Sequence, residues 1–235
     1  MRYALVLFGS AAALAGAGRG VAAVPLVDGC IRTGAGARPL LLRVGSFTAN
    51  AVILGHGRRG AVLANQSDRD LCSWKPLAAR LERGGFRVLL FDYSGADPQD
   101  DVAVGVAALR GRGVRAVALV GASKGARSVL VAAGERPASV SAVVSLSSET
   151  TSLPGAPRIE PFVRRLQARV LFVAARQDPW TGDGTETHEL FAAAPKTLRQ
   201  LVEVVGSDHG VDLLAGQHGA RLSALVESFL ARSTR

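Results

Sequence analysis

Ser123 stands at the centre of a short, glycine-flanked stretch, Gly121-Ala122-Ser123-Lys124-Gly125. An apolar run typical of a buried strand, Val114–Val120, precedes it, and a helix-like segment, Lys124–Ala133, follows it. In a G-x-S-x-G turn between a strand and a helix, the serine takes a strained backbone conformation that exposes its hydroxyl, and the glycines let the helix pass close by. The plain alternative is an ordinary strand-to-helix connection built from small residues. Ser123 is a nucleophile only if the chain also supplies a base and an acid that orients the base.

A serine hydroxyl becomes a good nucleophile only beside a base, and the chain has four histidines. His209 lies in a Gly-Ser-Asp-His-Gly stretch soon after a predicted strand, Leu198–Val204. That position is the carboxyl edge of a parallel sheet, where reactive groups gather. The remaining histidines are expected to have surface or turn roles, since they lie in a glycine-rich turn and in two predicted helices: His56, His188 and His218.

Asp178 is the acid that we expect to orient the imidazole of His209. It follows a predicted strand, Val170–Ala174, in the stretch Arg-Gln-Asp-Pro-Trp. A carboxylate in that place can hold the required tautomer and stabilise the imidazolium ion. Asp183, five positions later, and Glu149, after the preceding strand, remain alternative acids.

Strands and helices alternate from residue 39 onward, and continuous apolar strands indicate a sheet covered on both faces. The pattern predicts an α/β fold with a doubly wound, mostly parallel sheet and helices on both faces. The predicted strands are Leu40–Val44, Ala51–Leu54, Ala61–Ala64, Phe86–Phe91, Val114–Val120, Val140–Leu146, Val170–Ala174 and Leu198–Val204. The predicted helices are Trp74–Arg83, Val102–Leu109, Lys124–Ala133, Phe162–Leu166, Thr185–Ala193 and Leu213–Leu230.

The sequence resembles the α/β-hydrolase family over roughly residues 39–231. The matching stretches are GASKG, RQDPW, GSDHG and ANQSDRDLCSWKPLAARLERGGFRVLLFDYSG, and the chain order Ser123, Asp178, His209 is that of the family. The resemblance is greatest to small exported hydrolases with dienelactone-hydrolase proportions. It implies an α/β-hydrolase fold without a cap domain, and a serine hydrolase that cleaves a carboxylic ester or thioester through an acyl-enzyme.

The spacing of the family also places Asn65-Gln66-Ser67 in the loop that binds the oxyanion. The backbone N–H of Lys124, and that of Ser67 or Gln66, are the expected donors. Asn and Gln replace the His-Gly that many relatives carry there, and this departure is the only support for the alternative function, a catalytically idle binding or cell-envelope protein. A Ser–Lys dyad is not expected, because adjacent residues of such a turn point in different directions.

His56 lies in Gly55-His56-Gly57, which resembles the His-Gly of an oxyanion loop. However, it stands between two short predicted strands, too far before Trp74 for the family spacing. We therefore predict that Gly55–Gly60 forms a hairpin turn.

The N-terminus predicts export. Met1-Arg2 precedes an apolar run, Tyr3–Ala17, and small residues continue to Ala23, as in a signal peptide. The expected organisation is a signal peptide over residues 1–23, an extension over 24–38 and one domain over 39–231. The apolar run is too short for a comfortable membrane span, so no stable span is expected after cleavage. The alternative is a buried N-terminal helix or strand.

Two cysteines, Cys30 and Cys72, are then expected to form a disulfide, because an exported chain without a metal motif favours one. Two separate buried thiols are the alternative. In the chain-entropy model, closing a loop of this length stabilises the fold by at most about 4 kcal/mol.

Charge, composition and motif spacing argue against nucleic acid, metal ions and cofactors as partners. The net charge is +9, but the arginines are scattered and the chain has only two Tyr and two Trp, which disfavours nucleic-acid binding. No cluster has metal-ligand spacing, and GASKG lacks the order of a phosphate loop, so no cofactor is expected. The predicted partner is a small-molecule ester, and the oligomeric state stays open.

Overall fold

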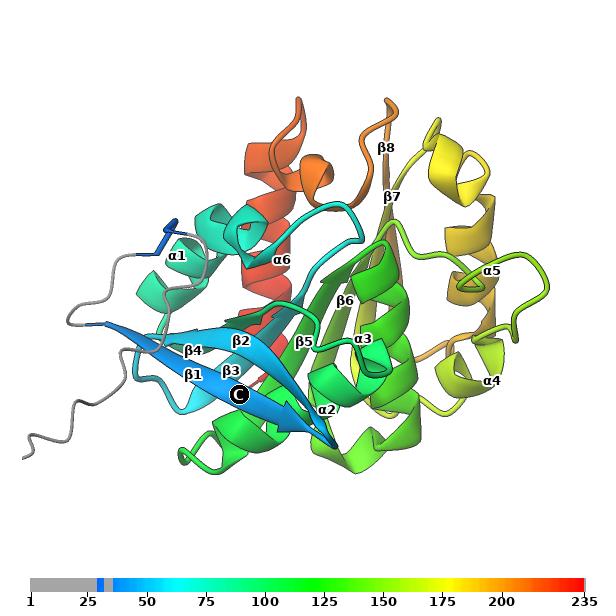
Figure 1. Ribbon diagram of the computed structural model, residues 1–235. Coiled ribbons are helices and arrows are strands. Elements are labelled where there is room, and N and C mark those ends of the chain that lie inside the picture. Colours follow the sequence, from blue (N-terminus) through cyan, green and yellow to red (C-terminus); the bar gives the residue numbers. More distant parts are fainter. Residues whose placement is uncertain (1–28, 32–35, 235) are drawn as a thin grey trace, which may run out of the picture.

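The computed structural model describes residues 29–31 and 36–234 (Figure 1). The predicted signal peptide over residues 1–23 lies outside the described residues, as does part of the predicted extension. Within the described ranges, no helix is both long and apolar enough to cross a membrane.

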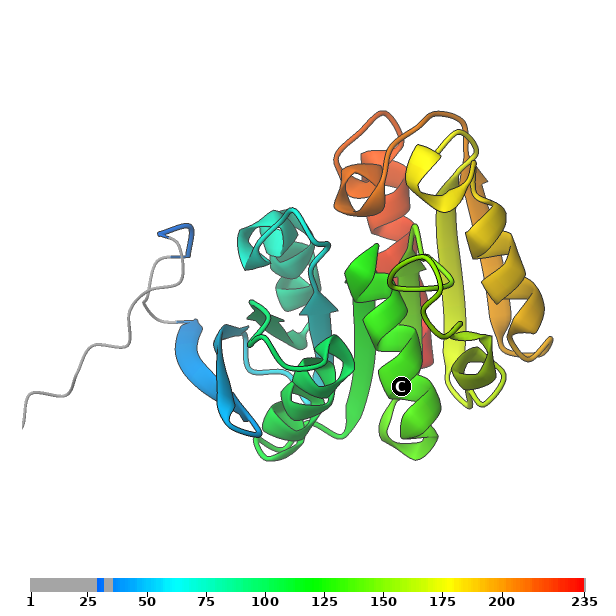
Figure 2. The same ribbon diagram turned by 45° about the vertical axis from the view of Figure 1, so that its right-hand side comes forward.

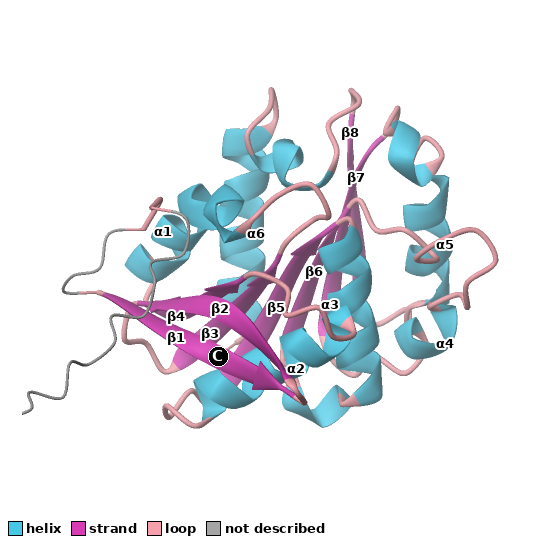
Figure 3. Ribbon diagram, viewed as in Figure 1, coloured by secondary structure: helices cyan, strands magenta, loops and turns pink. Residues whose placement is uncertain are grey.

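Strands and helices alternate along the described chain (Figure 3). The strands are β1 (Ala37–Val44), β2 (Phe47–Leu54), β3 (Arg59–Ala64), β4 (Phe86–Phe91), β5 (Ala116–Ala122), β6 (Ala142–Leu146), β7 (Arg169–Ala175) and β8 (Arg199–Val204). The α-helices are α1 (Lys75–Arg83), α2 (Pro98–Arg110), α3 (Lys124–Glu135), α4 (Glu160–Val163), α5 (Thr185–Ala193) and α6 (Gly219–Ser233). Short 3-10 turns are η1 (Leu71–Trp74), η2 (Pro137–Ser139), η3 (Pro179–Thr181) and η4 (Gly210–Leu214).

The strands form one sheet in the order β1-β2-β4-β3-β5-β6-β7-β8. Strands β3 to β8 run parallel to one another, whereas β1 and β2 are antiparallel to their neighbours at one end of the sheet. Because the carboxyl ends of parallel strands meet at one edge, the loops after β3, β5, β6, β7 and β8 gather there.

Helices cover both faces of this sheet (Figures 1 and 2). Leu77 of α1 and Phe229 of α6 pack on one face, with Leu63 of β3. The other face packs against α2, α3, α4 and α5, with Val62 of β3 in its core. Successive residues of a strand point to opposite faces, so a run with no polar residue suits burial on both sides. The predicted doubly wound sheet with helices on both faces is confirmed.

The predicted hairpin at Gly55–Gly60 is wrong. β4 lies between β2 and β3, pairing antiparallel with β2 and parallel with β3, so the segment after β2 crosses the end of β4 instead of reversing into its neighbour. Gly57 allows this crossing, because a Cβ there would lie 2.0 Å from the carbonyl oxygen of Gly85. The glycines correctly indicate that β2 ends before Gly55, but the local sequence does not show which strand pairs with β2.

Only a loop and the short helix α4 connect β6 to β7. The helix begins at Glu160, two residues before the predicted position, and ends at Val163. This connection is too short to form a separate cap domain, so the expectation of a fold without a cap is confirmed.

The predicted disulfide is present. Cys30 and Cys72 are bonded, with their Cα atoms 6.0 Å apart and 42 positions apart in the chain. Cys72 lies in η1, so the bond ties residues 29–31 to the turn that leads into α1.

Reducing this disulfide is expected to lower the melting temperature, because the unfolded chain regains the freedom that a closed loop removes. The loss of unfolding free energy should be at most about 4 kcal/mol. Thermal unfolding followed by circular dichroism, with and without reductant, measures it. The Cys30→Ser/Cys72→Ser variant is the control, since its melting temperature should match the reduced protein and not respond to reductant. An unchanged melting temperature after complete reduction, verified by a thiol assay, would contradict the prediction.

Candidate active site

Ser123 forms the turn between β5 and α3. Its backbone has φ 52° and ψ −118°, outside the regions that residues with a Cβ commonly occupy. A Cβ on Gly121 would lie 2.2 Å from the carbonyl oxygen of Gly125, and a Cβ on Gly125 would lie 2.1 Å from that of Ala64. The two glycines therefore let α3 pass close to β5 and β3. The chain makes the sharp turn that the sequence predicts.

His209 and Asp178 are in hydrogen-bond contact beyond the ends of β8 and β7. The Nδ1 atom of His209 lies 2.9 Å from Oδ2 and 3.0 Å from Oδ1 of Asp178. Asp178 is fully buried, and its Oδ1 also accepts a hydrogen bond from the backbone N–H of Trp180 at 3.1 Å. A carboxylate can only accept, so this contact assigns the proton to Nδ1 and leaves Nε2 of the neutral ring as an acceptor.

Two buried hydrogen bonds fix the backbone directly after His209. The N–H of Gly210 donates to Oγ of Ser147 at 3.0 Å, and the N–H of Val211 donates to Oε1 of Gln66 at 2.9 Å. These partners follow β6 and β3, so the loop that carries His209 is attached to two neighbouring loops of the same sheet edge.

The side chain of Gln66 therefore has a role that sequence reasoning missed. Its Oε1 accepts from Val211, while its Nε2 donates to Oδ1 of Asp68 at 2.8 Å. This donation holds the pKa of Asp68 below its usual value. The sequence predicts a role only for the backbone N–H of Gln66, because the side-chain contact with Val211 joins residues 145 positions apart.

The loop predicted to bind the oxyanion follows β3, directly beside the turn at Ser123. Ala64 and Gly121 are paired residues of β3 and β5, so the chain segments after them are neighbours. Asn65 is buried, and its side-chain amide donates to the carbonyl oxygen of Phe91 at 3.0 Å. Gln66 and Ser67 follow in this loop, and Lys124 follows Ser123, so the expected backbone donors lie in adjacent segments.

Tyr93 supports this loop and also binds Lys124. Its hydroxyl donates to the carbonyl oxygen of Asn65 at 2.8 Å, and burial raises the pKa of Tyr93 well above its ordinary value, so it remains a donor. The Nζ atom of Lys124 lies 4.1 Å from the centre of the Tyr93 ring, and burial lowers the pKa of this ammonium group. The ammonium group thus packs on Tyr93, which agrees with the expectation that it does not serve Ser123.

Glu149 contacts Ser123, which sequence reasoning also missed. The hydroxyl of Ser123 donates to Oε1 of Glu149 at 3.2 Å, while Nη1 of Arg127 lies 2.7 Å from Oε2. The sequence suggested Glu149 and Asp183 as alternative acids for His209. The structure instead places Asp178 on His209 and Glu149 on the serine.

The other three histidines have partners away from Ser123. His56 precedes β3, at the edge of the sheet opposite to Ser123, and its carbonyl oxygen accepts from Arg87 at 2.9 Å. His188 of α5 pairs with Glu203 at 2.8 Å, and Nε2 of His218 lies 3.1 Å from the carbonyl oxygen of Val205.

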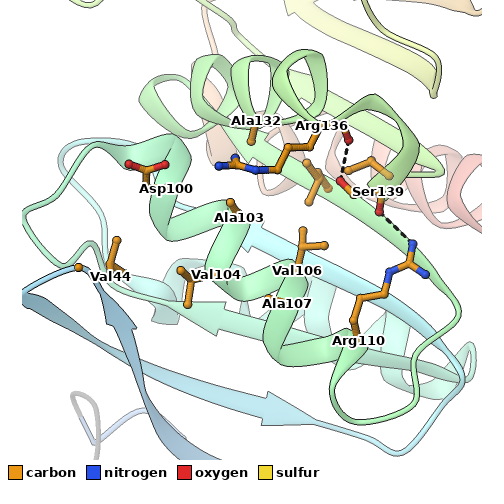
Figure 4. A pocket seen from close by; sticks show the side chains of 13 residues that line it. Val44, Asp100, Ala103, Val104, Val106, Ala107, Arg110, Ala132, Arg136 and Ser139 are labelled. Carbon is orange, nitrogen blue, oxygen red and sulfur yellow. Dashed lines mark hydrogen bonds between the residues drawn. The ribbon is translucent and has the colours of Figure 1, made fainter.

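A cavity of about 530 Å³ lies between α2 and α3, lined mainly by small apolar side chains (Figure 4). Arg110 and Arg136, at the carboxyl ends of these helices, stand at its rim with Ser139. None of the predicted site residues lines this cavity. Among the described residues, no three His, Cys, Asp or Glu side chains are grouped so that they could hold a metal ion.

Neither a protein-family model nor a curated protein matches the sequence. Solved structures do match. A monoacylglycerol lipase from Paleococcus ferrophilus is 15% identical with a TM-score of 0.69, and the match covers 79% of this chain and 99% of the lipase. The esterase domain of a Rhodothermus marinus protein is 20% identical with a TM-score of 0.66, covering 83% of this chain and 99% of the domain.

A dienelactone hydrolase from Anabaena variabilis is 18% identical with a TM-score of 0.65, and the match covers 85% of this chain and 98% of the hydrolase. Each match covers about four fifths or more of this chain and nearly all of the matched structure. The chain has the α/β-hydrolase fold.

Proposed function

We propose that this protein is a serine hydrolase that cleaves a carboxylic ester or thioester through Ser123, His209 and Asp178. The observation that carries the proposal is the contact of 2.9 Å between His209 Nδ1 and the buried carboxylate of Asp178, at the sheet edge where Ser123 occupies its strained turn. The similarity to structures described as a lipase, an esterase and a dienelactone hydrolase supports it.

In the proposed mechanism, Ser123 Oγ attacks the carbonyl carbon of the substrate and His209 Nε2 takes the hydroxyl proton. Asp178 keeps the imidazole in the correct tautomer and stabilises the imidazolium ion. His209 then gives the proton to the leaving group. In deacylation His209 takes a proton from water as the water oxygen attacks the acyl carbon, and it returns that proton to Ser123 Oγ when the acid is released.

The oxyanion is held by the backbone N–H of Lys124 and by that of Gln66 or Ser67. Such donors act because they are fixed before charge develops, and losing one costs about 3–4 kcal/mol of barrier. The hydrogen bonds of Asn65 and of the Gln66 side chain support this assignment, since they hold the loop in place on both sides.

We also propose that the protein is exported and acts on a small-molecule ester outside the cytoplasm. The disulfide between Cys30 and Cys72 supports this location, because such bonds persist in oxidising compartments.

Short-chain esters are expected to be hydrolysed without activation by a lipid interface, since only a loop and α4 connect β6 to β7. The test is the initial rate with p-nitrophenyl acetate, butyrate and palmitate, each measured across the micellar threshold. The expected result is saturation kinetics with the acetate and butyrate, and no jump in rate for the palmitate. A sharp rise above the threshold would contradict the expectation drawn from the missing cap domain, and no hydrolysis of any ester by the folded protein would contradict the proposed function.

A further inference from the structure

We infer that Glu149 selects esters whose acyl group carries a hydrogen-bond donor, a hydroxyl or an ammonium group, on the carbon next to the scissile carbonyl. The inference rests on the proposed function and adds to it a substrate class. Its starting point is the hydrogen bond of 3.2 Å from the hydroxyl of Ser123 to Oε1 of Glu149.

The backbone on both sides of Glu149 is anchored. Ser147 has φ 52°, and its N–H donates to the carbonyl oxygen of Val173 at 2.9 Å. On the other side, the hydroxyl of Thr150 donates to Oε2 of Glu186 at 2.7 Å. The position of Glu149 is therefore determined by the end of β6 and by α5 before any substrate binds.

The carboxylate itself is oriented by Arg127. Nη1 of Arg127 donates to Oε2 of Glu149 at 2.7 Å and to the carbonyl oxygen of Thr151 at 2.8 Å. Both side chains are mostly buried, with 13% of Arg127 and 25% of Glu149 exposed. Oε2 is thus held by an arginine, and Oε1 faces the nucleophile.

Catalysis removes the donor from Oε1. The serine hydroxyl has a single proton, and in the proposed mechanism it goes to His209 Nε2, so Ser123 can no longer donate to Glu149. A partly buried carboxylate oxygen without a donor is unfavourable, and a substrate that supplies one recovers the lost interaction. The substrate's donor can bind Oε1 only once Ser123 no longer donates to it. The new hydrogen bond therefore stabilises the transition state relative to the free enzyme.

The geometry places this donor on the acyl side. When Oγ bonds to the carbonyl carbon, a substituent on the neighbouring acyl carbon is three bonds from Oγ, within reach of an oxygen that lay 3.2 Å from it. The leaving oxygen must instead face His209, which protonates it. Hydroxyl and ammonium groups both satisfy Oε1, and the negative charge of Glu149 favours the ammonium more.

The experiment compares kcat/KM for p-nitrophenyl esters of four acids: propanoic, 2-methoxypropanoic, 2-hydroxypropanoic and 2-aminopropanoic acid. The methoxy ester has nearly the inductive effect of the hydroxy ester and is larger by one CH2, but it has no donor. Each rate is divided by that of the uncatalysed hydrolysis. The hydroxy and amino esters are expected to be preferred about tenfold over the other two, because they donate to Oε1 of Glu149. The factor is not larger because water competes for a partly exposed carboxylate.

Two variants assign the preference to Glu149. Glu149→Ala should reduce both preferences to within about twofold, because no acceptor remains. Glu149→Gln should also lose both preferences: Arg127 can only donate, so the amide oxygen takes the place of Oε2 and the NH2 group, a donor, faces the substrate. Glu227→Gln is the matched control: it breaks another arginine–glutamate pair, of 3.0 Å with Arg80 on α1, and should leave all four ratios unchanged.

An active wild-type enzyme that hydrolyses the four esters with equal normalised efficiency would overturn the inference and leave the proposed function intact. Preferences that persist in Glu149→Ala would also overturn it. Hydrolysis of none of the esters by the folded wild type would overturn the proposed function, and with it this inference.

Discussion

The Ser123→Ala variant is expected to lose about four to six orders of magnitude in kcat for p-nitrophenyl acetate, because it removes the atom that forms the acyl-enzyme. A residual rate above that of water should remain, since the predicted oxyanion donors and the binding site are untouched. KM should change little. Initial rates at saturating ester, with enzyme purified free of host esterases, measure this loss.

Ser128→Ala is the matched control for this variant. Ser128 lies on α3, its side chain is buried, and its hydroxyl donates to the carbonyl oxygen of Lys124 at 2.7 Å. Removing that hydroxyl costs one hydrogen bond close to the turn but no reacting atom, so activity should stay within about tenfold. Comparable activity in Ser123→Ala and the wild type would show that another residue performs the reaction.

The His209→Ala variant is expected to lose about four orders of magnitude or more in kcat, because it removes the imidazole that takes the proton of Ser123 in the proposed mechanism. The loss should not depend on the acyl group. His56→Ala is the control, since His56 lies before β3 at the opposite edge of the sheet. It should keep most of the activity. Equal losses in the two variants would contradict the assignment of the base.

Most of the fold could be predicted from local patterns. β4 and α5 have the predicted bounds, because the apolar run Phe86–Phe91 begins directly after Gly85 and is followed by Asp92. Helix α2 begins earlier than predicted, at Pro98, since proline has a φ that suits the first turn and no N–H to leave unpaired.

The pairing of strands could not be predicted in the same way. The turn after β2 is compatible with a hairpin, and only the position of β4 between β2 and β3 rules it out. Pairing depends on segments more than 30 positions apart, such as Val52 and Leu90, and no local pattern reports it.

Part of the candidate site could be predicted from the sequence. Ser123, Asp178 and His209 were proposed because each follows a predicted strand, and topology brings such positions to one edge. The contacts of Glu149 and of the Gln66 side chain were not visible, because they depend on side-chain directions in irregular segments. Ser147 shows the difficulty. Its φ of 52° changes the direction of the chain two residues before Glu149, yet a serine in a sequence does not indicate a positive φ.

Labelling with a fluorophosphonate probe tests the central claim most directly, since the probe bonds covalently only to an activated serine. The folded wild type should take up one label, and mass spectrometry of the digested protein should locate it on Ser123. Ser123→Ala should take up none, and His209→Ala should be labelled far more slowly. A folded wild type that takes up no label, or that carries it on a different residue, would contradict the account and favour a binding protein with an idle site.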